Sequence, residues 1–166
     1  MTIFEKLVTL LDEKQASFKI IEHPAEGHTE IISAIRGNAP EQAAKAMVLQ
    51  IITGGKPVRY VLAIIPGDSR VNFKNVANLM GGKKSSFAPR EVAQELTNCV
   101  MGAVPPFSFD ERLPLLIDDR IRNIGTLFFK AGELERSISL NTDDYFRVVG
   151  KTFSGEISTS IVTNKP

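Results

Sequence analysis

One lysine stands in a stretch that otherwise has the pattern of a buried strand. Residues 43–52, AAKAMVLQII, are rich in β-formers, carry a single charge and run directly into a glycine-rich turn. Because side chains alternate along a strand, Lys45 faces the same way as three apolar side chains, those of Met47, Leu49 and Ile51. A lysine on an apolar face either extends its ammonium group to water or meets an anion. Lys45 is therefore either a strand-end lysine reaching solvent or a cation at the mouth of a pocket, facing a phosphate or a carboxylate.

Residues 100–108, VMGAVPPFS, form a second unusual stretch. They are apolar, yet they include Gly102 and the consecutive prolines Pro105 and Pro106, so they cannot form a regular central strand. We expect an ordered apolar loop. It either packs on the core as a rigid connection or forms the wall of a pocket, with its backbone groups exposed to a ligand.

Familiar catalytic motifs are absent from the sequence. It contains no G-x-S-x-G elbow, P-loop, Rossmann glycine fingerprint or H-E-x-x-H motif. Cys99 could pair with His23 or His28, but it lies in an apolar stretch, which favours a structural thiol. Asp118 and Asp119 are adjacent and would point to opposite faces of a strand, although Asp118 could cap the following turn. An enzyme with this sequence would therefore work mainly by positioning its substrate and by backbone hydrogen bonds.

Basic residues gather in one helix–loop–helix section of the chain. They are Arg70, Lys74, Lys83, Lys84 and Arg90. Such a group can be an ordinary solvated surface. It can also contact an RNA backbone, where neutralisation of phosphates supplies most of the affinity.

The elements that must position these residues follow from periodicity and turn signals. Expected N-caps are Thr2, Thr29, Asn72 and either Asn141 or Thr142. We expect helices at 2–14, 29–35, 73–80, 89–96 and 142–149, strands at 18–23, 43–52, 58–65, 114–117, 126–130 and 136–140, and an extended segment at 85–88. Residues 131–132 are expected to form the turn between the last two strands.

Hairpins outnumber βαβ units in this order of elements. The sequence therefore predicts one α/β domain of the α+β type over residues 1–150, with a mixed, mainly antiparallel sheet flanked by short helices. The polar tail at 151–166, rich in Ser and Thr, is expected to be loosely attached.

Composition bounds the function classes. The chain has 166 residues, of which 43% are hydrophobic and 23% charged, and its net charge is +1, so nucleic acid or a membrane would have to bind a local patch. Charged residues interrupt the apolar positions near the N-terminus, and we expect neither a secretory signal nor a membrane span. A single cysteine indicates a reducing, cytoplasmic location. Two histidines without an acidic cluster predict no metal site.

Three blocks of the chain, in this order, resemble the YbaK family, which includes the editing domain inserted in bacterial prolyl-tRNA synthetases and its free-standing relatives. The first is AKAMVLQ, with Lys45, followed by IIPGDSRVNFKNVANLMGGKKSSFAP. The second is LTNCVMGAVPPF, whose residues 102–106 match the family's G-x-x-x-P loop, and the third comprises LLIDDRI, FFKAG and SISL. The resemblance covers about residues 18–149, and VPPFSF looks like the YeaK-type free-standing members.

The resemblance implies a YbaK-like fold, in part a barrel, and an aminoacyl-tRNA deacylase that acts in trans without a cofactor. It implies that Lys45 is the essential lysine, contacting the terminal adenosine or its phosphate, and that N–H groups around Gly102 hold the aminoacyl carbonyl and orient a water. The substrate's own ribose hydroxyl would assist. The substrate-binding residues would be Met47, Ala103, Val104, Pro106, Lys130 and Ser137.

Two positions depart from the family pattern. Members usually have a small polar residue in place of Lys130 and Gly in place of Asn98. A cation at Lys130 could add a phosphate contact or repel the substrate's α-ammonium group.

We therefore hold two hypotheses: a deacylase for tRNA mischarged with a small amino acid (Ala, Ser, Cys or Thr), and a non-catalytic module that binds tRNA or an aminoacyl ligand. A fold used for protein–protein interaction is a third. Aminoacyl-tRNA and an aminoacyl-tRNA synthetase are the candidate partners; DNA and membranes are not expected.

Overall fold

The computed structural model describes residues 1–161, which contain five α-helices, two 3-10 helices and ten strands. The helices are α1 (Ile3–Glu13), α2 (Thr29–Arg36), α3 (Phe73–Leu79), α4 (Arg90–Thr97), α5 (Thr142–Val149), η1 (Pro40–Gln42) and η2 (Asp119–Asn123). The strands are β1 (Phe18–Glu22), β2 (Ala44–Ile52), β3 (Arg59–Pro66), β4 (Ser69–Val71), β5 (Lys84–Phe87), β6 (Leu115–Asp118), β7 (Thr126–Glu133), β8 (Arg136–Asn141), β9 (Phe153–Gly155) and β10 (Ser158–Ser160).

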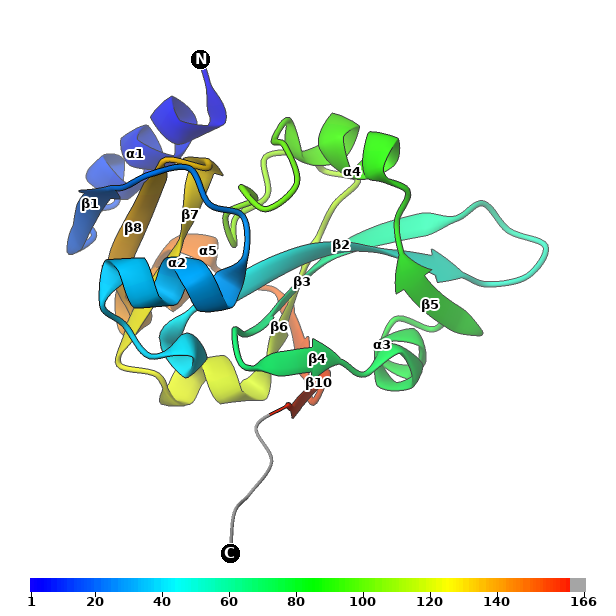
Figure 1. The fold of residues 1–166 in the computed structure, drawn as a ribbon. Coiled ribbons are helices and arrows are strands. Elements are labelled where there is room, and N and C mark those ends of the chain that lie inside the picture. The colour runs from blue at the N-terminus through cyan, green and yellow to red at the C-terminus, as the bar shows by residue number, and fades with distance from the viewer. Residues whose placement is uncertain (162–166) are drawn as a thin grey trace, which may run out of the picture.

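The strands form three sheets (Figure 1). Their orders are β5-β2-β3-β6-β9, β1-β8-β7 and β10-β4, and within residues 1–161 every pairing is antiparallel except β3 with β6 and β6 with β9. An isolated parallel bridge between Ala43 and Phe128 joins the start of β2 to β7. The predicted α+β domain with a mainly antiparallel sheet is confirmed, and the bridge connects the two larger sheets at one point.

Strand β2 separates two apolar clusters because its side chains alternate. Ala44 and Val48 belong to the larger cluster, which also contains buried residues of α1, α4 and α5. Leu49 and Ile51 belong to the smaller cluster over α3, and Met47 packs against it. The predicted grouping of these three side chains on one face of the strand is confirmed, and Lys45 begins that face.

Most of the predicted helix N-caps are confirmed. Thr2 forms a capping box with Glu5 at the start of α1, with hydrogen bonds of 2.8 and 3.1 Å. Asn72 and Asn141 cap α3 and α5. The prediction of Thr29 as a cap is wrong: Thr29 is the first residue of α2, and His28 occupies the N-cap position without a side-chain cap bond.

The predicted turn at residues 131–132 is also wrong. Strand β7 continues to Glu133, and its pairing with β8 shifts between Lys130 and Glu133 as a β-bulge. Gly132 lies in the bulge with φ +89°, and a Cβ there would come within 2.9 Å of Ile3 Cγ2 in α1. Gly132 therefore marks a bulge within β7 rather than a reversal of the chain.

The C-terminal segment is attached to the domain as far as Ser160, so the prediction of a loose tail is wrong for residues 153–160. Strand β9 extends the five-stranded sheet, β10 pairs with β4, and Ile157 between them is fully buried. The Asp118 carboxylate fixes this crossing by accepting hydrogen bonds from Ile157 N (3.0 Å) and Ser158 Oγ (2.7 Å). The end of the predicted tail, residues 162–166, lies outside the described residues. Across residues 1–161, each helix is too short or too polar to cross a membrane.

Candidate functional site

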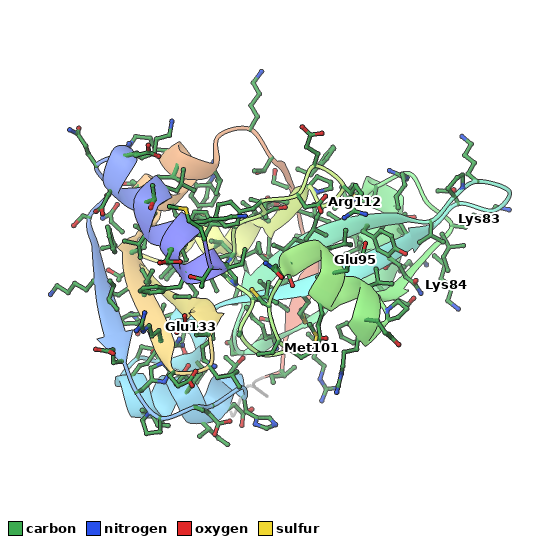
Figure 2. The ribbon with its side chains drawn as sticks, turned by 90° about the horizontal axis from the view of Figure 1, so that it is seen from above. Lys83, Lys84, Glu95, Met101, Arg112 and Glu133 are labelled. Atoms are coloured by element: carbon green, nitrogen blue, oxygen red, sulfur yellow. The ribbon has the colours of Figure 1, made fainter. Side chains whose placement is uncertain are left out.

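A cavity of about 370 Å³ opens between the two larger sheets. Its walls come from the start of β2, the middle of β7, helix α2, the loop at 100–108 and the segment from the end of β5 into α4. Of the residues predicted for the site, Lys45, Met47, Gly102, Val104 and Lys130 all line this cavity. Segments that are far apart in the sequence therefore meet at one place. The loop itself follows α4, and its Met101 lies beside that helix (Figure 2).

The wall of the cavity is basic. Within residues 1–161 it includes four cationic side chains and no Asp or Glu. The four are Arg36, Lys45, Arg90 and Lys130. None of them forms a salt bridge among the described residues. A concave surface with several cations and no carboxylate attracts an anionic ligand.

Lys45 forms no salt bridge with a carboxylate within the described chain. Its side chain is half-buried, and its Nζ donates a hydrogen bond of 3.2 Å to the carbonyl oxygen of Ser69 at the start of β4. Burial lowers the pKa of Lys45, while the charges of Glu30 and Asp68 act in the opposite direction. The remaining donors of the ammonium group are available to a ligand in the cavity.

Lys130 and Arg36 form the other basic side of the cavity. Lys130 is 7% exposed, and its Nζ donates to the carbonyl oxygen of Gly102 at 3.2 Å. Burial, and then the charge of Arg36, lower the pKa of Lys130 to about 8. Arg36 donates to Ser137 Oγ and Asn38 Oδ1, each at 3.0 Å, and burial lowers its pKa to about 10.

The loop at 100–108 lines the cavity and contains backbone donors that are unpaired within residues 1–161. Gly102 has φ +86°, and a Cβ there would lie 2.8 Å from the Cα of Gly27. The N–H of Ala103 is used within the loop, because it donates to the carbonyl of Val100 at 3.1 Å. The N–H groups of Gly102 and Val104 have no hydrogen-bond partner within residues 1–161. Two donors in this loop are therefore free to meet a carbonyl oxygen.

Three predicted substrate-binding residues lie behind the wall rather than in it. Ala103 is fully buried, and its carbonyl accepts the N–H of Gly132 at 2.9 Å, which docks the loop on the bulge of β7. Pro106 is buried, and its carbonyl accepts the Tyr145 hydroxyl at 2.8 Å. Ser137 is fully buried, with its Oγ 3.0 Å from Arg36 and 2.8 Å from His23 Nε2. In this structure Ser137 positions Arg36.

The basic section predicted to contact RNA is exposed but lies outside the cavity, except for Arg90. Arg70 projects from β4 and Lys74 from α3, and both are exposed. Lys83 and Lys84 lie near the tip of the β2–β3 hairpin, at the opposite end of the view from Glu133 (Figure 2). These four residues are not part of the cavity wall.

Cys99 has no catalytic environment. It is buried, its Sγ donates to the carbonyl of Thr97 at 3.4 Å, and burial raises its pKa to about 11. His23 contacts Ser137 instead of the thiol. Within residues 1–161, no three His, Cys, Asp or Glu side chains are grouped to hold a metal ion.

The backbone conformation explains why asparagine can stand at position 98, where members of the family usually have glycine. This residue ends α4 in the left-handed conformation, with φ 56° and ψ 33°. Glycine adopts this conformation most easily, and asparagine is among the few other residues that tolerate it. Asn98 therefore keeps the geometry that a glycine would have at this position.

Sequence reasoning missed several residues of the cavity. Arg36 has the position of an ordinary basic residue in the last turn of a helix, and Phe128 and Phe87 have those of ordinary strand aromatics. Their residue types gave no distinguishing signal, because the place they occupy becomes concave only when β2, β5 and β7 come together.

The sequence profile of the aminoacyl-tRNA editing domain matches residues 23–148. The chain belongs to this family. One relative, the multifunctional Ser/Thr-tRNA deacylase ProXp-y of Escherichia coli K12, is 38% identical over 145 residues, which are 87% of this chain and 86% of the relative. A proline–tRNA ligase of Bacillus mycoides is 26% identical over 116 residues, which cover 70% of this chain and 20% of the ligase.

Solved structures share the fold of this editing domain. A protein with a proposed trans-editing role for prolyl-tRNA synthetase superimposes with a TM-score of 0.77 and 19% identity, over 96% of this chain and 99% of the other. A hypothetical protein superimposes with a TM-score of 0.81 and 16% identity, over 93% and 99%. Family membership makes the chain an editing enzyme, an aminoacyl-tRNA deacylase.

Proposed function

We propose that this editing domain acts in trans on tRNA mischarged with a small amino acid, of the alanine, serine, cysteine or threonine type. The observation that carries the proposal is the cavity itself, which brings Lys45 together with Gly102 and Val104, whose N–H groups are unpaired within residues 1–161, while no Ser, Cys or His is among the described lining residues. A relative that covers most of the chain is a Ser/Thr-tRNA deacylase, which supports the same substrate class.

The aminoacyl group is selected by size. Met47 and Val104 are apolar parts of the wall of this cavity of about 370 Å³. One methylene changes binding by only about 1–3 kcal/mol, so a pocket of this kind excludes larger residues by bulk.

Hydrolysis proceeds by positioning. The Lys45 ammonium group binds the terminal adenosine or its phosphate, and the N–H groups of Gly102 and Val104 donate to the ester carbonyl oxygen. These donors stabilise the negative charge that develops there when a water molecule adds to the carbonyl carbon. The bond from that carbon to the ribose oxygen then breaks, and the ribose oxygen leaves with a proton. The neighbouring ribose hydroxyl of the substrate orients the water.

The tRNA body is held by exposed cations. Arg70, Lys74, Lys83 and Lys84 contact phosphates and contribute affinity that falls with salt. A proline–tRNA ligase is among the relatives, and a synthetase is the candidate protein partner. A non-catalytic binding module is the second candidate, because Lys130 places another cation against the carbonyl of Gly102.

A deacylation panel tests the proposal. Purified protein is mixed with tRNAs charged with Ala, Ser, Cys, Thr and Pro, and ester loss is followed for the wild type, Lys45→Ala and Lys19→Ala. Lys19 is an exposed lysine of β1 that does not line the cavity. We expect rapid loss of one or two small aminoacyl groups, abolished only by Lys45→Ala, with both variants folded.

Two results would contradict this assignment. Activity of Lys45→Ala near that of the wild type would remove the lysine from the mechanism. Saturable tRNA binding without loss of any ester would favour the binding module, and Lys130→Ser would then be the next variant to test for turnover.

A further inference from the structure

An aromatic ring lies exposed at the cavity. Phe87, the last residue of β5, is 58% exposed, the most exposed of the phenylalanines in residues 1–161, and it lines the cavity wall. A ring at this position contributes little to the core. It presents a planar apolar face to a cavity whose charged side chains among the described residues are all cationic.

The ring is held in place although it is exposed. Phe73 contacts it edge-on, with ring centroids 5.1 Å apart and an interplanar angle of 85°. The backbone of Phe87 pairs with Leu49 of β2, and Pro89 follows two residues later. A ring whose orientation is fixed in advance loses little conformational entropy when a second ring stacks on it.

Phe87 shares a face of the sheet with Lys45. Leu49, its partner in β2, faces the same way as Met47 and Lys45 because these residues alternate along the strand. At about 3.3 Å per residue, the four residues from Lys45 to Leu49 span roughly 13 Å. The ring of Phe87 therefore lies on the same face as Lys45, displaced from it by about this length of strand.

Positive charge accompanies the ring. Arg90, three residues after Phe87, is exposed and lines the same cavity without an ion-pair partner in the described chain. A positive groove beside an exposed aromatic ring is the arrangement with which proteins bind single-stranded nucleic acid. An apolar peptide would not need the cations, and an acidic peptide would not need the planar ring.

We propose that Phe87 is a stacking surface for one nucleobase in the single-stranded 3′ end of tRNA, with Arg90 contacting an adjacent phosphate. The proposal rests on the proposed function and deepens it, since it assigns a position to the strand that carries the ester. It gives a role in substrate binding to the part of the cavity wall that runs from the end of β5 into α4.

The first test compares Phe87→Ala, Phe87→Leu and Phe87→Trp, with Phe153→Ala as the control. Phe153 is a 51% exposed ring on β9 that does not line the cavity. Stacking predicts that kcat/KM for charged tRNA falls about 5- to 150-fold in the Ala variant, falls similarly in the Leu variant, and is retained in the Trp variant. Wild-type kcat/KM in Phe87→Ala, or full retention in Phe87→Leu, would overturn the proposal.

The second test identifies the base and does not require turnover. Uncharged tRNA carrying 2-aminopurine at the terminal or an adjacent position is titrated with the wild type and with Phe87→Ala, because 2-aminopurine fluorescence is quenched on stacking. We expect quenching at one position, lost in Phe87→Ala. Equal quenching by both proteins, or none by either, would overturn the proposal. If the deacylation panel fails while this quenching is observed, the proposed reaction is wrong and the stacking site stands.

Discussion

Replacing Gly102 by alanine tests whether the loop at 100–108 is held in one position by its contact with Gly27. Gly102 has φ +86°, and a Cβ there would lie 2.8 Å from the Cα and 3.1 Å from the carbonyl oxygen of Gly27. Both neighbours are backbone atoms, so no flexible side chain can turn away. The loop or the segment before α2 must move.

Two effects add to give the expected loss of stability. The left-handed conformation costs an alanine roughly 1–2 kcal/mol relative to glycine, partly offset by the lower entropy of the unfolded chain. The close contact adds about 1–3 kcal/mol, as overpacking does elsewhere. We therefore expect Gly102→Ala to lower the free energy of unfolding by about 2–4 kcal/mol.

Gly81→Ala is a matched control, because Gly81 has φ +70° but a Cβ there would meet no atom within 4 Å. It should therefore lose only the conformational part, about 1 kcal/mol. Urea unfolding gives the free energy of unfolding of each variant, and kcat/KM for deacylation gives the effect on the site.

The two glycine variants should also differ in activity. Moving the loop from a 2.8 Å contact to an ordinary one of 3.4 Å displaces the Gly102 N–H by about 0.6 Å, and a displacement of ~1 Å at a reacting group can cost 10²-fold in rate. We expect a loss of about tenfold or more in kcat/KM for Gly102→Ala and none for Gly81→Ala. Equal losses of stability in the two variants would refute the role of the Gly27 contact.

Two further predictions concern buried charges. Because the pKa of Lys130 is lowered to about 8 from 10.5, the unfolded state binds more protons between these values, and stability rises with pH across that range. Lys130→Met should therefore have a free energy of unfolding about 1–3 kcal/mol higher than that of the wild type at pH 7. Urea unfolding should show this difference shrinking by pH 10. A difference that stays constant with pH would contradict this reasoning. Asp118→Ala should lose about 3–5 kcal/mol, because it removes the acceptor of Ile157 N and Ser158 Oγ, whereas Asp119→Ala, at an exposed position, should lose less than about 0.5 kcal/mol. Thermal unfolding of the two Asp variants provides the comparison, and similar melting temperatures would contradict the role given to Asp118.

Local signals in the sequence were sufficient for most elements. The caps at Thr2, Asn72 and Asn141 act within three residues of their own position, so they could be predicted without knowledge of the fold. The alternation of side chains along β2 is also a local property, and it correctly predicted that Met47, Leu49 and Ile51 share one face.

Sequence signals that are compatible with more than one structure led to wrong predictions. A glycine with positive φ can reverse the chain or form a bulge, and at Gly132 the choice depends on α1 packing across β7. The polar segment after Gly150 has the composition of a loose tail. It is ordered because the buried carboxylate of Asp118, far away in the sequence, accepts its hydrogen bonds.

The sequence by itself determined the class of fold, the unusual character of Lys45 and the apolar loop, and the absence of familiar catalytic motifs, because each depends on residue type and short spacing. Only the tertiary structure decided which cations share the cavity. Arg36, Lys45, Arg90 and Lys130 come from four separate elements, and they meet because β2 packs beside β7 under α2 while β5 leads into α4. The same packing buried Ser137 behind Arg36 and left Phe87 exposed, since burial depends on which surfaces meet and not on residue type alone.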